Sequence, residues 1–387
     1  MAHASNPNDK PAGFATRAIH AGLSPAECDG AVSQPVYHST IYELKPTKGL
    51  KSGEFSYSRA ANPNRRALET ALADLDGGAA ALAFSTGVAA IDALLATLPY
   101  GSDILVPEDY YMGTRRVLWD LHADRLRWKS VDMRDPDRVR AQIVPGTKLV
   151  WVETPSNPRL HLTDIEAIAA IAHAKGAALV VDGTWATPVL TRPIEFGADV
   201  VIHSATKYMG GHSDVAMGAL VFKEKGDLFE DCRTRQWAGG AVPSPQDCWL
   251  VRRGLMTMAL RMERHCENAL EIAKWLAKRP EVSAVHYPGL ATGRQLALAK
   301  RQMQGGFGGV VSFQLKGGEK AAKALPRAMK IAVNATSLGG VESLIEQRRA
   351  SEGPDSPTPA DLVRFSVGIE DVADLIADLE QALAQVG

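Results

Sequence analysis

The sequence predicts an α/β protein with a large, mostly parallel sheet and a smaller C-terminal α/β domain. Short apolar segments that resemble strands are separated by segments with helical periodicity; the strands cover residues 79–84, 103–106, 148–152, 178–181 and 200–202. Strands that alternate with helices form parallel sheets covered by helices on both faces. The chain has 387 residues, 45% of them hydrophobic, which is enough for two packed domains.

The N-terminal part is expected to extend away from this sheet. Residues 1–13 are polar and rich in Asn and Pro, and residues 16–53 contain turn residues without a sustained period. Such a segment is typical of an arm that reaches a neighbouring subunit. We therefore predict an arm over residues 1–55, a large domain over 56–250 and a C-terminal domain over 251–387.

Helices are predicted where apolar residues recur at helical spacing. In the large domain they cover residues 64–76, 88–98 and 162–175. The C-terminal part is predicted to hold a long, weakly interrupted helical region over 246–278, strands over 309–315, 331–335 and 362–367, and a last helix from about Asp371. Residues 352–360, with three prolines and a glycine, are predicted to form a surface loop.

Composition excludes several classes of partner. The 43 basic and 44 acidic residues give a net charge of −1, without the long basic block that nucleic acid or an anionic membrane surface would require. Residues 1–13 lack the apolar region of a signal peptide, and no later apolar run approaches the length of a membrane span, so we expect the protein to stay where it is made. The four cysteines stand singly, without the paired spacing of a zinc site, and fit reduced thiols in the cytoplasm.

The segment VIHSATKYMGGHSD, residues 201–214, gives the clearest indication of a functional site. A strand delivers Ser204, Thr206 and Lys207 into a loop that contains glycine. A lysine at the carboxyl end of a strand in a parallel sheet is placed for a ligand pocket. Taken alone, Lys207 would be interpreted first as an ordinary solvated loop lysine, because most lysines are exposed.

Two further segments support a pocket at the same edge. In LVVDGT, residues 179–184, Asp182 ends an apolar strand, where a buried carboxylate needs a cationic partner. A protonated pyridine nitrogen is such a partner, while a lysine forms the Schiff base at the aldehyde of the same cofactor. Ser85-Thr86-Gly87-Val88 joins a strand to a helix, whose free N–H groups would hold a phosphate. Considered separately, Asp182 also fits a turn cap, and short glycine loops are common.

Six separated motifs then resemble, in order, the signatures of the Cys/Met-metabolism PLP-dependent enzymes. They are YSRAANPN (57–64), ETPSNP (153–158), VVDGTWATP (180–188), residues 201–214, SLGGVESL (337–344) and LVRFSVGIED (362–371). The resemblance runs from about Thr16 to the C-terminus. It implies the aspartate aminotransferase-like fold type I of PLP-dependent transferases, pyridoxal 5′-phosphate (PLP) as cofactor, and a homotetramer built as a dimer of dimers.

The resemblance also implies roles for cofactor-binding residues. Lys207 would hold PLP covalently and later carry protons between substrate carbons, Asp182 would pair with the pyridinium nitrogen, and Tyr111 would stack on the ring. The phosphate would be bound by Gly87, Val88, Ser204 and Thr206, and by Tyr57 and Arg59 of a neighbouring subunit. Without the motifs, Tyr57 and Tyr111 would fit half-buried aromatic residues.

Substrate-binding roles follow from the same resemblance. Arg364 would clamp the substrate α-carboxylate, a task for which the planar guanidinium is suited. Ser337 would orient Lys207 or the substrate, and Asn157, assigned to the substrate side, would also contact the ring oxygen of PLP. Arg116, five residues after Tyr111, would contact a distal carboxylate. Without the motifs, Arg364 would fit a strand-edge surface charge.

The expected reaction is γ-replacement, in which the thiol of cysteine displaces the acyloxy group at Cγ of an O-acylhomoserine and gives cystathionine. The alternative is β- or γ-elimination from cystathionine. O-acylhomoserine sulfhydrylases are less favoured, and so are methionine γ-lyases, which have a cysteine where this chain has Gly113. Three departures from the family pattern leave the substrate open. Thr336 replaces a glutamate, Met112 replaces a glycine, and residues 346–352 replace a Met-Thr-His segment.

Two other classes of function are disfavoured by the residues present. A catalytically silent PLP-binding scaffold would have no need for Lys207, Asp182, Tyr111 and Arg364 together. A nucleotide-binding oxidoreductase would need a G-x-G-x-x-G segment opening a helix after the first strand, which is missing.

Overall fold

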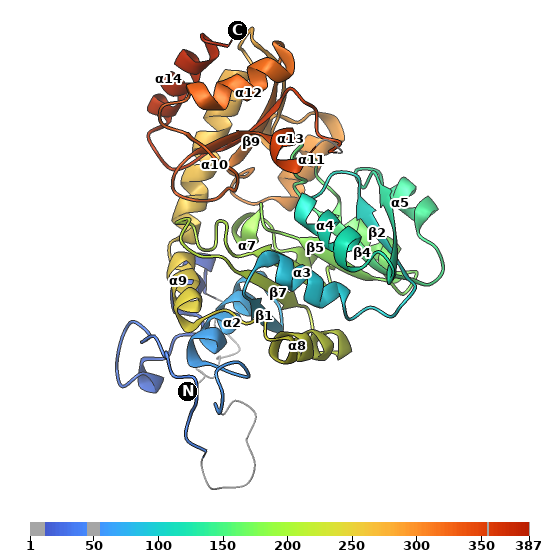
Figure 1. Cartoon of the computed structure of the whole chain (residues 1–387), viewed down its shortest axis with the longest axis vertical. Helices are drawn as coiled ribbons and strands as arrows, with labels where there is room; N and C mark the ends of the chain where they lie inside the picture. The colour runs from blue at the N-terminus through green and yellow to red at the C-terminus, as the bar shows by residue number, and fades with distance from the viewer. Residues whose placement is uncertain (1–11, 45–54, 354–355, 387) are drawn as a thin grey trace.

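Two sheets, each with its own helices, are stacked along the long axis of the molecule (Figure 1). The structure is a computed structural model that describes residues 12–44, 55–353 and 356–386. The predicted arm over 1–55 lies partly outside these residues. Its described part contains the short helix α1 (Phe14–His20), which sequence periodicity did not predict.

The larger sheet has seven strands in the order β1-β7-β6-β5-β4-β2-β3. The five strands from β6 to β3 in this order are parallel, whereas β7 pairs antiparallel with both β1 and β6. The predicted α/β class with a mostly parallel sheet is therefore confirmed. The strands are β1 (Ala80–Phe84), β2 (Ser102–Pro107), β3 (Leu126–Val131), β4 (Thr147–Glu153), β5 (Ala178–Asp182), β6 (Val200–Ser204) and β7 (Gly218–Phe222).

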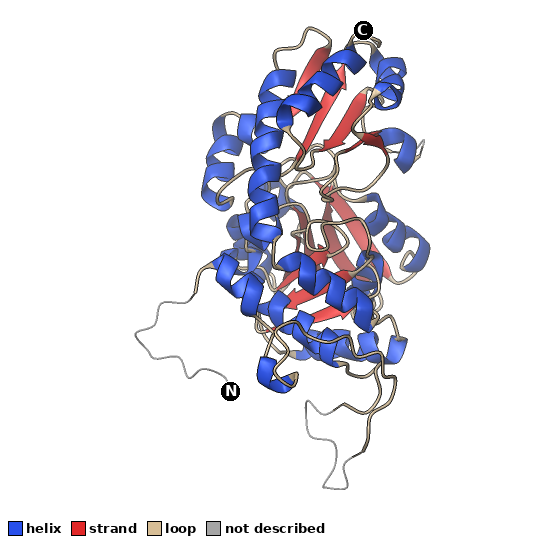
Figure 2. Cartoon of the chain, turned by 90° about the vertical axis from the view of Figure 1, so that its left-hand side faces the viewer, coloured by secondary structure: helices blue, strands red, loops and turns tan. Residues whose placement is uncertain are grey.

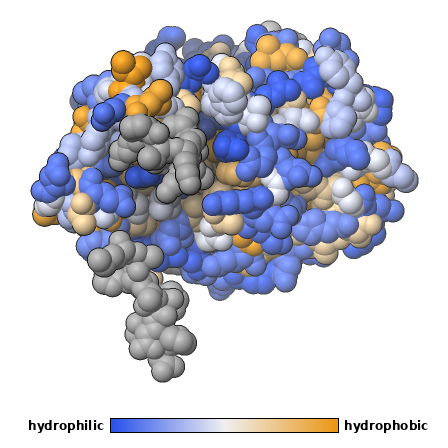
Figure 3. Space-filling view, turned by 90° about the horizontal axis from the view of Figure 1, so that it is seen from below, coloured by the Kyte–Doolittle hydropathy of each residue, from blue (hydrophilic) through white to orange (hydrophobic). Residues whose placement is uncertain are grey.

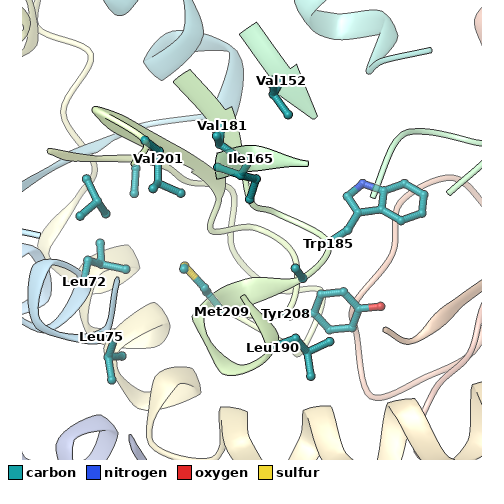
Figure 4. Close-up of a cluster of buried hydrophobic side chains, with 14 of the residues drawn as sticks. Leu72, Leu75, Val152, Ile165, Val181, Trp185, Leu190, Val201, Tyr208 and Met209 are labelled. Atoms are coloured by element: carbon teal, nitrogen blue, oxygen red, sulfur yellow. The ribbon is translucent and has the colours of Figure 1, made fainter. Parts of the chain in front are cut away.

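Helices cover both faces of this sheet because alternate strand residues point to opposite sides. On one face, Leu72 and Leu75 of α2 lie in one buried cluster with Val181 and Val201 of the sheet (Figure 4). The helices of that face are α2 (Pro63–Asp76), α5 (Pro136–Gln142), α6 (Ile165–His173), α7 (Thr187–Leu190) and α9 (Pro245–Leu255). The other face is covered by α3 (Gly87–Leu95), α4 (Met112–Leu121) and α8 (Asp227–Gly239).

Helix α2 shows why its ends fall where the sequence predicted them. Its N-cap, Asn62, accepts a hydrogen bond from the backbone N–H of Asn64, and Pro63 occupies the first helical position, where a missing N–H costs nothing. At the other end Gly77 adopts the left-handed conformation (φ 74°), which glycine enters without steric penalty.

The smaller sheet has five strands in the order β10-β11-β12-β9-β8, and all pairs except β10 with β11 are antiparallel. The strands are β8 (Val282–His286), β9 (Val310–Leu315), β10 (Val333–Asn334), β11 (Leu344–Gln347) and β12 (Leu362–Ser366). Its core is shared with α10 (Met258–Leu276), α12 (Gly318–Ala328) and α14 (Val372–Leu383), and in the side view helices flank the strands of both sheets (Figure 2). Helices α11 (Gly293–Gln302) and α13 (Arg348–Glu352) lie on the side toward the larger domain (Figure 1). Short 3-10 turns cover Pro25–Glu27, Pro193–Phe196 and Pro288–Leu290.

The structure corrects several element predictions. The helical region over 246–278 is divided between α9 and α10, with the break at Met256 and Thr257. The strand expected over 331–335 is reduced to β10. The stretch 352–360 is not simply a surface loop, because Ser356 and Thr358 are buried. The domain boundaries at residues 55 and 250 stay predictions.

One end of the molecule presents a mostly polar surface. Seen from the end that carries the N-terminal segment, it is predominantly hydrophilic, with small, separate apolar patches (Figure 3). Within the described residues, no helix is both long and apolar enough to cross a membrane.

Candidate active site

A cavity of about 520 Å³ lies at the carboxyl edge of the larger sheet, where the two domains meet. Its floor is formed by residues at the ends of β5 and β6 and in the first turn of α3. The smaller domain supplies the opposite wall, from the segment that precedes β11, from α13 and from β12. Twelve of the lining residues carry the argument below; they are Gly87, Val88, Tyr111, Arg116, Asn157, Asp182, Ser204, Thr206, Lys207, Ser337, Arg348 and Arg364.

Lys207 joins the two domains at the centre of this cavity. Its Nζ donates a hydrogen bond to Oγ of Ser337 at 2.5 Å. Ser337 has a left-handed backbone (φ 90°), an unfavourable conformation for a residue with a side chain. Burial, followed by the positive charges of Arg364 and Arg348, lowers the pKa of Lys207 to about 8. A lysine with a lowered pKa holds a larger fraction of neutral, nucleophilic amine at neutral pH.

Asp182 stands at the end of β5, next to β6, which leads to Lys207. The carboxylate accepts a hydrogen bond from the backbone N–H of Thr184 at 3.0 Å. Burial raises the pKa of Asp182, while the bonds from Thr184 and the charge of His203 oppose the rise. A buried carboxylate that lines a cavity is suited to a cationic ligand group.

The first turn of α3 provides free backbone donors. Thr86 caps the helix by accepting from the N–H of Ala89 at 3.1 Å, and within the described part of the chain the N–H groups of Gly87 and Val88 have no acceptor. A side chain at Gly87 would lie 3.2 Å from Oγ of Ser204, so glycine lets this hydroxyl approach the turn. These donors form an anion site at a helix N-terminus.

Thr206 departs in part from the role that the motif implies. Its Oγ1 donates to the carbonyl of Met217 at 3.2 Å and accepts from the N–H of the same residue at 2.9 Å. The hydroxyl proton is thus already engaged, although Thr206 lines the cavity.

Tyr111 and Arg116 approach from α4. The backbone N–H of Tyr111 donates to Oε2 of Glu153 at 2.7 Å, which fixes the start of the helix. A side chain at Gly113 would come within 2.2 Å of the Tyr111 ring, so this position must be glycine for the ring to lie where it does. Arg116 is mainly exposed and pairs with Asp120 at 2.7 Å, so its guanidinium can turn toward the cavity that it lines.

Arg364, on β12, is the most enclosed cation of the site. Its Nη1 donates to Oδ1 of Asn157 at 3.2 Å and its Nη2 to the carbonyl of Ser337 at 3.1 Å and to Glu346. The guanidinium carbon lies 5.7 Å from the centre of the Trp185 ring. Burial lowers the pKa of Arg364 to about 10, so it stays charged at neutral pH.

Tyr57 and Arg59 do not line the cavity of their own chain. Arg59 donates to the carbonyl of Trp237 at 2.7 Å and lies over the Tyr57 ring. Their assignment to the site of a neighbouring subunit stays a prediction.

Comparison with known proteins agrees with this geometry. The profile of the Cys/Met metabolism PLP-dependent enzymes matches residues 15–384. The chain belongs to this family.

Similar members of the family include both synthases and lyases. Cystathionine gamma-synthase of Mycobacterium tuberculosis is 48% identical, over 96% of this chain and 97% of that protein. Cystathionine beta-lyase of Coxiella burnetii is 42% identical, over 97% of this chain and 99% of that protein. The crystal structure of metB from Corynebacterium glutamicum superimposes with a TM-score of 0.94, at 43% identity and over 99% of this chain and 100% of that one. The chain is therefore a PLP-dependent transferase or carbon–sulfur lyase.

The residues fit the cofactor that the family name implies. An amine with a lowered pKa is available at Lys207, a buried carboxylate at Asp182, and free N–H donors at Gly87 and Val88. These three sites match the aldehyde, pyridine nitrogen and phosphate of PLP, and they face one cavity.

Sequence reasoning missed several residues of the wall. Trp185 lies inside the motif VVDGTWATP, but its position beside Arg364 can be recognised only from the three-dimensional structure. Arg348, Ser351 and Glu352 lie in the segment that was noted only as a departure from the family pattern. The replacement of a family motif by charged residues in this segment could have indicated that these residues line the site.

Proposed function

We propose that this enzyme catalyses γ-replacement, in which O-acylhomoserine and cysteine give cystathionine and the free carboxylic acid. The observation that carries the proposal is that one cavity holds Lys207 together with two arginines, Arg364 and Arg116. Such a pair suits a substrate with an α-carboxylate at one end and a second carboxylate at the other. The 48% identity to a cystathionine gamma-synthase supports the same reaction.

The chain's own residues have distinct tasks in this proposal. Arg364 binds the α-carboxylate through the guanidinium donors that its protein partners leave open. Lys207, as the free amine, takes the proton from Cα and moves protons at Cβ, while Ser337 orients it. PLP, when bound through Lys207 and Asp182, supplies the electron-withdrawing system that makes Cα acidic. The C–O bond at Cγ breaks with loss of the carboxylate, and the cysteine sulfur forms the new bond at Cγ.

Elimination from cystathionine is the second candidate, favoured by the 42% identity to a cystathionine beta-lyase. Thr336 does not separate the two reactions, because cystathionine, the product of the first and the substrate of the second, carries the same distal ammonium, for which the uncharged threonine offers no partner. The two reactions differ in their products.

The test is to incubate PLP-loaded protein with O-succinylhomoserine and cysteine, and separately with cystathionine, and to identify products by mass spectrometry. Cystathionine from the first mixture supports the proposal. Pyruvate and ammonia from the second, without synthesis in the first, would identify a β-lyase. Lys207→Ala protein serves as the control for cofactor-dependent turnover.

The assembly and location of the enzyme are part of the same proposal. We place it in the cytoplasm as a homotetramer, with Tyr57 and Arg59 of each subunit completing the phosphate site of a neighbour. Light scattering after gel filtration measures the mass in solution. A monomeric enzyme with full activity would contradict the shared site.

A further inference from the structure

A buried histidine lies beneath the larger sheet, on the face opposite the cavity. His203 follows Val201 by two residues on β6, so both side chains point toward α2, whose Leu75 covers this face (Figure 4). The cavity is lined instead by the alternate residues of β6, Ile202 and Ser204. His203 therefore has no direct contact with a ligand in the cavity, and the roles assigned above do not use it.

Asp76, the last residue of α2, binds this histidine. Its Oδ2 lies 3.0 Å from Nε2 of His203, and the two side chains are 0% and 1% exposed. The C-terminal end of a helix carries a partial negative charge, which adds to the attraction for a cationic ring. Burial lowers the pKa of His203. The charge and hydrogen bond of Asp76, with the charge of Asp182, outweigh burial and raise this pKa above its ordinary value, which favours the protonated imidazole.

The other edge of the imidazole lies against the residue that follows Asp182. A side chain on Gly183 would place its Cβ 3.0 Å from Cε1 and 3.6 Å from Nδ1 of His203, so glycine lets the ring approach the backbone beside Asp182. The N–H of Gly183 donates to the carbonyl of Ile202 at 3.0 Å, which fixes this approach. Burial raises the pKa of Asp182, and the charge of His203 is among the effects that oppose the rise.

Charges of opposite sign therefore alternate from α2 to the cavity. Asp76 is followed by His203 and then by Asp182, and a protonated ring nitrogen bound at Asp182 would continue the series. We propose that Asp76 and His203 are positioning residues, which hold Asp182 ionised from the far face of the sheet and keep the proton on the ring nitrogen of the bound cofactor. The inference rests on the proposed assignment of Asp182 to PLP, but it does not depend on which amino acid is the substrate.

The first test measures whether His203 and Asp182 sense each other in the full-length protein without cofactor. The imidazole 15N signals of His203, assigned by their absence in His203→Gln, are followed by NMR as a function of pH. Asp182→Asn removes a charge without touching the hydrogen bond between Asp76 and His203. The midpoint of the titration should fall by about 1 unit, which is tenfold in proton affinity.

This shift is informative because coupling between two sites is reciprocal. Whatever Asp182 does to the proton affinity of His203, protonated His203 does to that of Asp182. The matched control is Asp92→Asn, which removes the carboxylate partner of His122 and should leave the midpoint of His203 unchanged. An unchanged midpoint in Asp182→Asn would overturn the inference.

The second test locates the proton on the bound cofactor. Pyridoxamine 5′-phosphate, labelled with 15N in the ring, has an amine in place of the aldehyde and binds without a bond to Lys207. A fluorine next to the ring nitrogen weakens its basicity, which brings the two positions of the proton, on the nitrogen and on Asp182, close in energy. In Asp76→Asn/His203→Gln, which keeps the net charge of the pair at zero, the proton should shift about tenfold toward Asp182. The nitrogen signal then moves toward that of a neutral pyridine.

Asp76→Asn alone should move the nitrogen signal in the same direction, so the test stands even if the double variant does not fold. The matched control, Asp92→Asn/His122→Gln, removes a pair that does not line the cavity and should leave the signal unchanged. An unchanged signal in both Asp76 variants overturns the inference. A shifted signal supports it even if the enzyme forms no cystathionine, in which case only the proposed reaction is wrong.

Discussion

The two sides of the cavity are built by different means. On the side of the larger sheet, Asp182 and Lys207 stand at or just after the ends of buried strands, and their positions follow from the sheet and its apolar clusters. On the side of the smaller domain, Arg364 and Arg348 are held by glutamates, with hydroxyls completing the network. Backbone geometry fixes the residues that we propose to hold the cofactor, whereas side-chain charges shape the wall that we propose to face the substrate. The wall can therefore change by substitution while the chemistry is retained.

Lys207→Ala should give the largest effect, because it removes the group assigned to proton transfer. We expect cystathionine formation to fall by about 10²- to 10⁴-fold. The rate is measured with added PLP, and circular dichroism checks that the sheet is intact. A variant that keeps more than about a tenth of the rate would contradict the role of this lysine.

Arg364→Lys tests the substrate wall with the charge retained. A lysine cannot reproduce the contacts of the planar guanidinium with Asn157 and Ser337 while also binding a carboxylate. We expect kcat/KM to fall by about 10- to 100-fold. An unchanged kcat/KM would show that charge alone suffices there.

Glu352→Gln tests whether charge pairing stabilises this wall. Loss of the carboxylate leaves Arg348 short of one buried partner, and we expect the free energy of unfolding to fall by about 1–3 kcal/mol in urea titrations. Glu166→Gln, in an exposed pair with Arg301, should cause no measurable change. An equal loss of unfolding free energy in the two variants would show that charge pairing does not stabilise this wall of the cavity.

The smallest expected effect concerns the pH dependence of the rate at which the apoprotein reacts with PLP. The reaction of apoprotein with PLP requires neutral Lys207, whose pKa is lowered to about 8. The rate should rise up to about pH 8 and then level off, rather than continue to rise above pH 10, as an unperturbed lysine would require. Arg348→Met removes a positive neighbour and should move this rise to higher pH. The rate is followed by absorbance of the bound cofactor.

The sequence predicted the cofactor side more fully than the substrate side. Strand ends and glycine turns are local patterns, so the neighbourhoods of Asp182, Lys207 and Gly87 were all expected before the fold was known. Strand β7 was missed, although its position between β1 and β6 determines how Gly87 meets Ser204. The pairing of Arg348 with Glu346 and Glu352 was also missed, because the helical turn that brings them together is only five residues long.

The position of β7 has a consequence for how the enzyme is made. Among the described strands, β1 lies at the edge of the sheet and pairs with β7 alone, so the ladder from Ala80–Phe222 to Phe84–Gly218 cannot form until β7 has been synthesised. During synthesis from the N-terminus, β1 and the turn at Gly87 leave the ribosome well before β7 exists. A nascent chain cut before β7 would therefore lack the strand that packs against the anion-binding turn and would expose β1 as an unpaired edge open to aggregation.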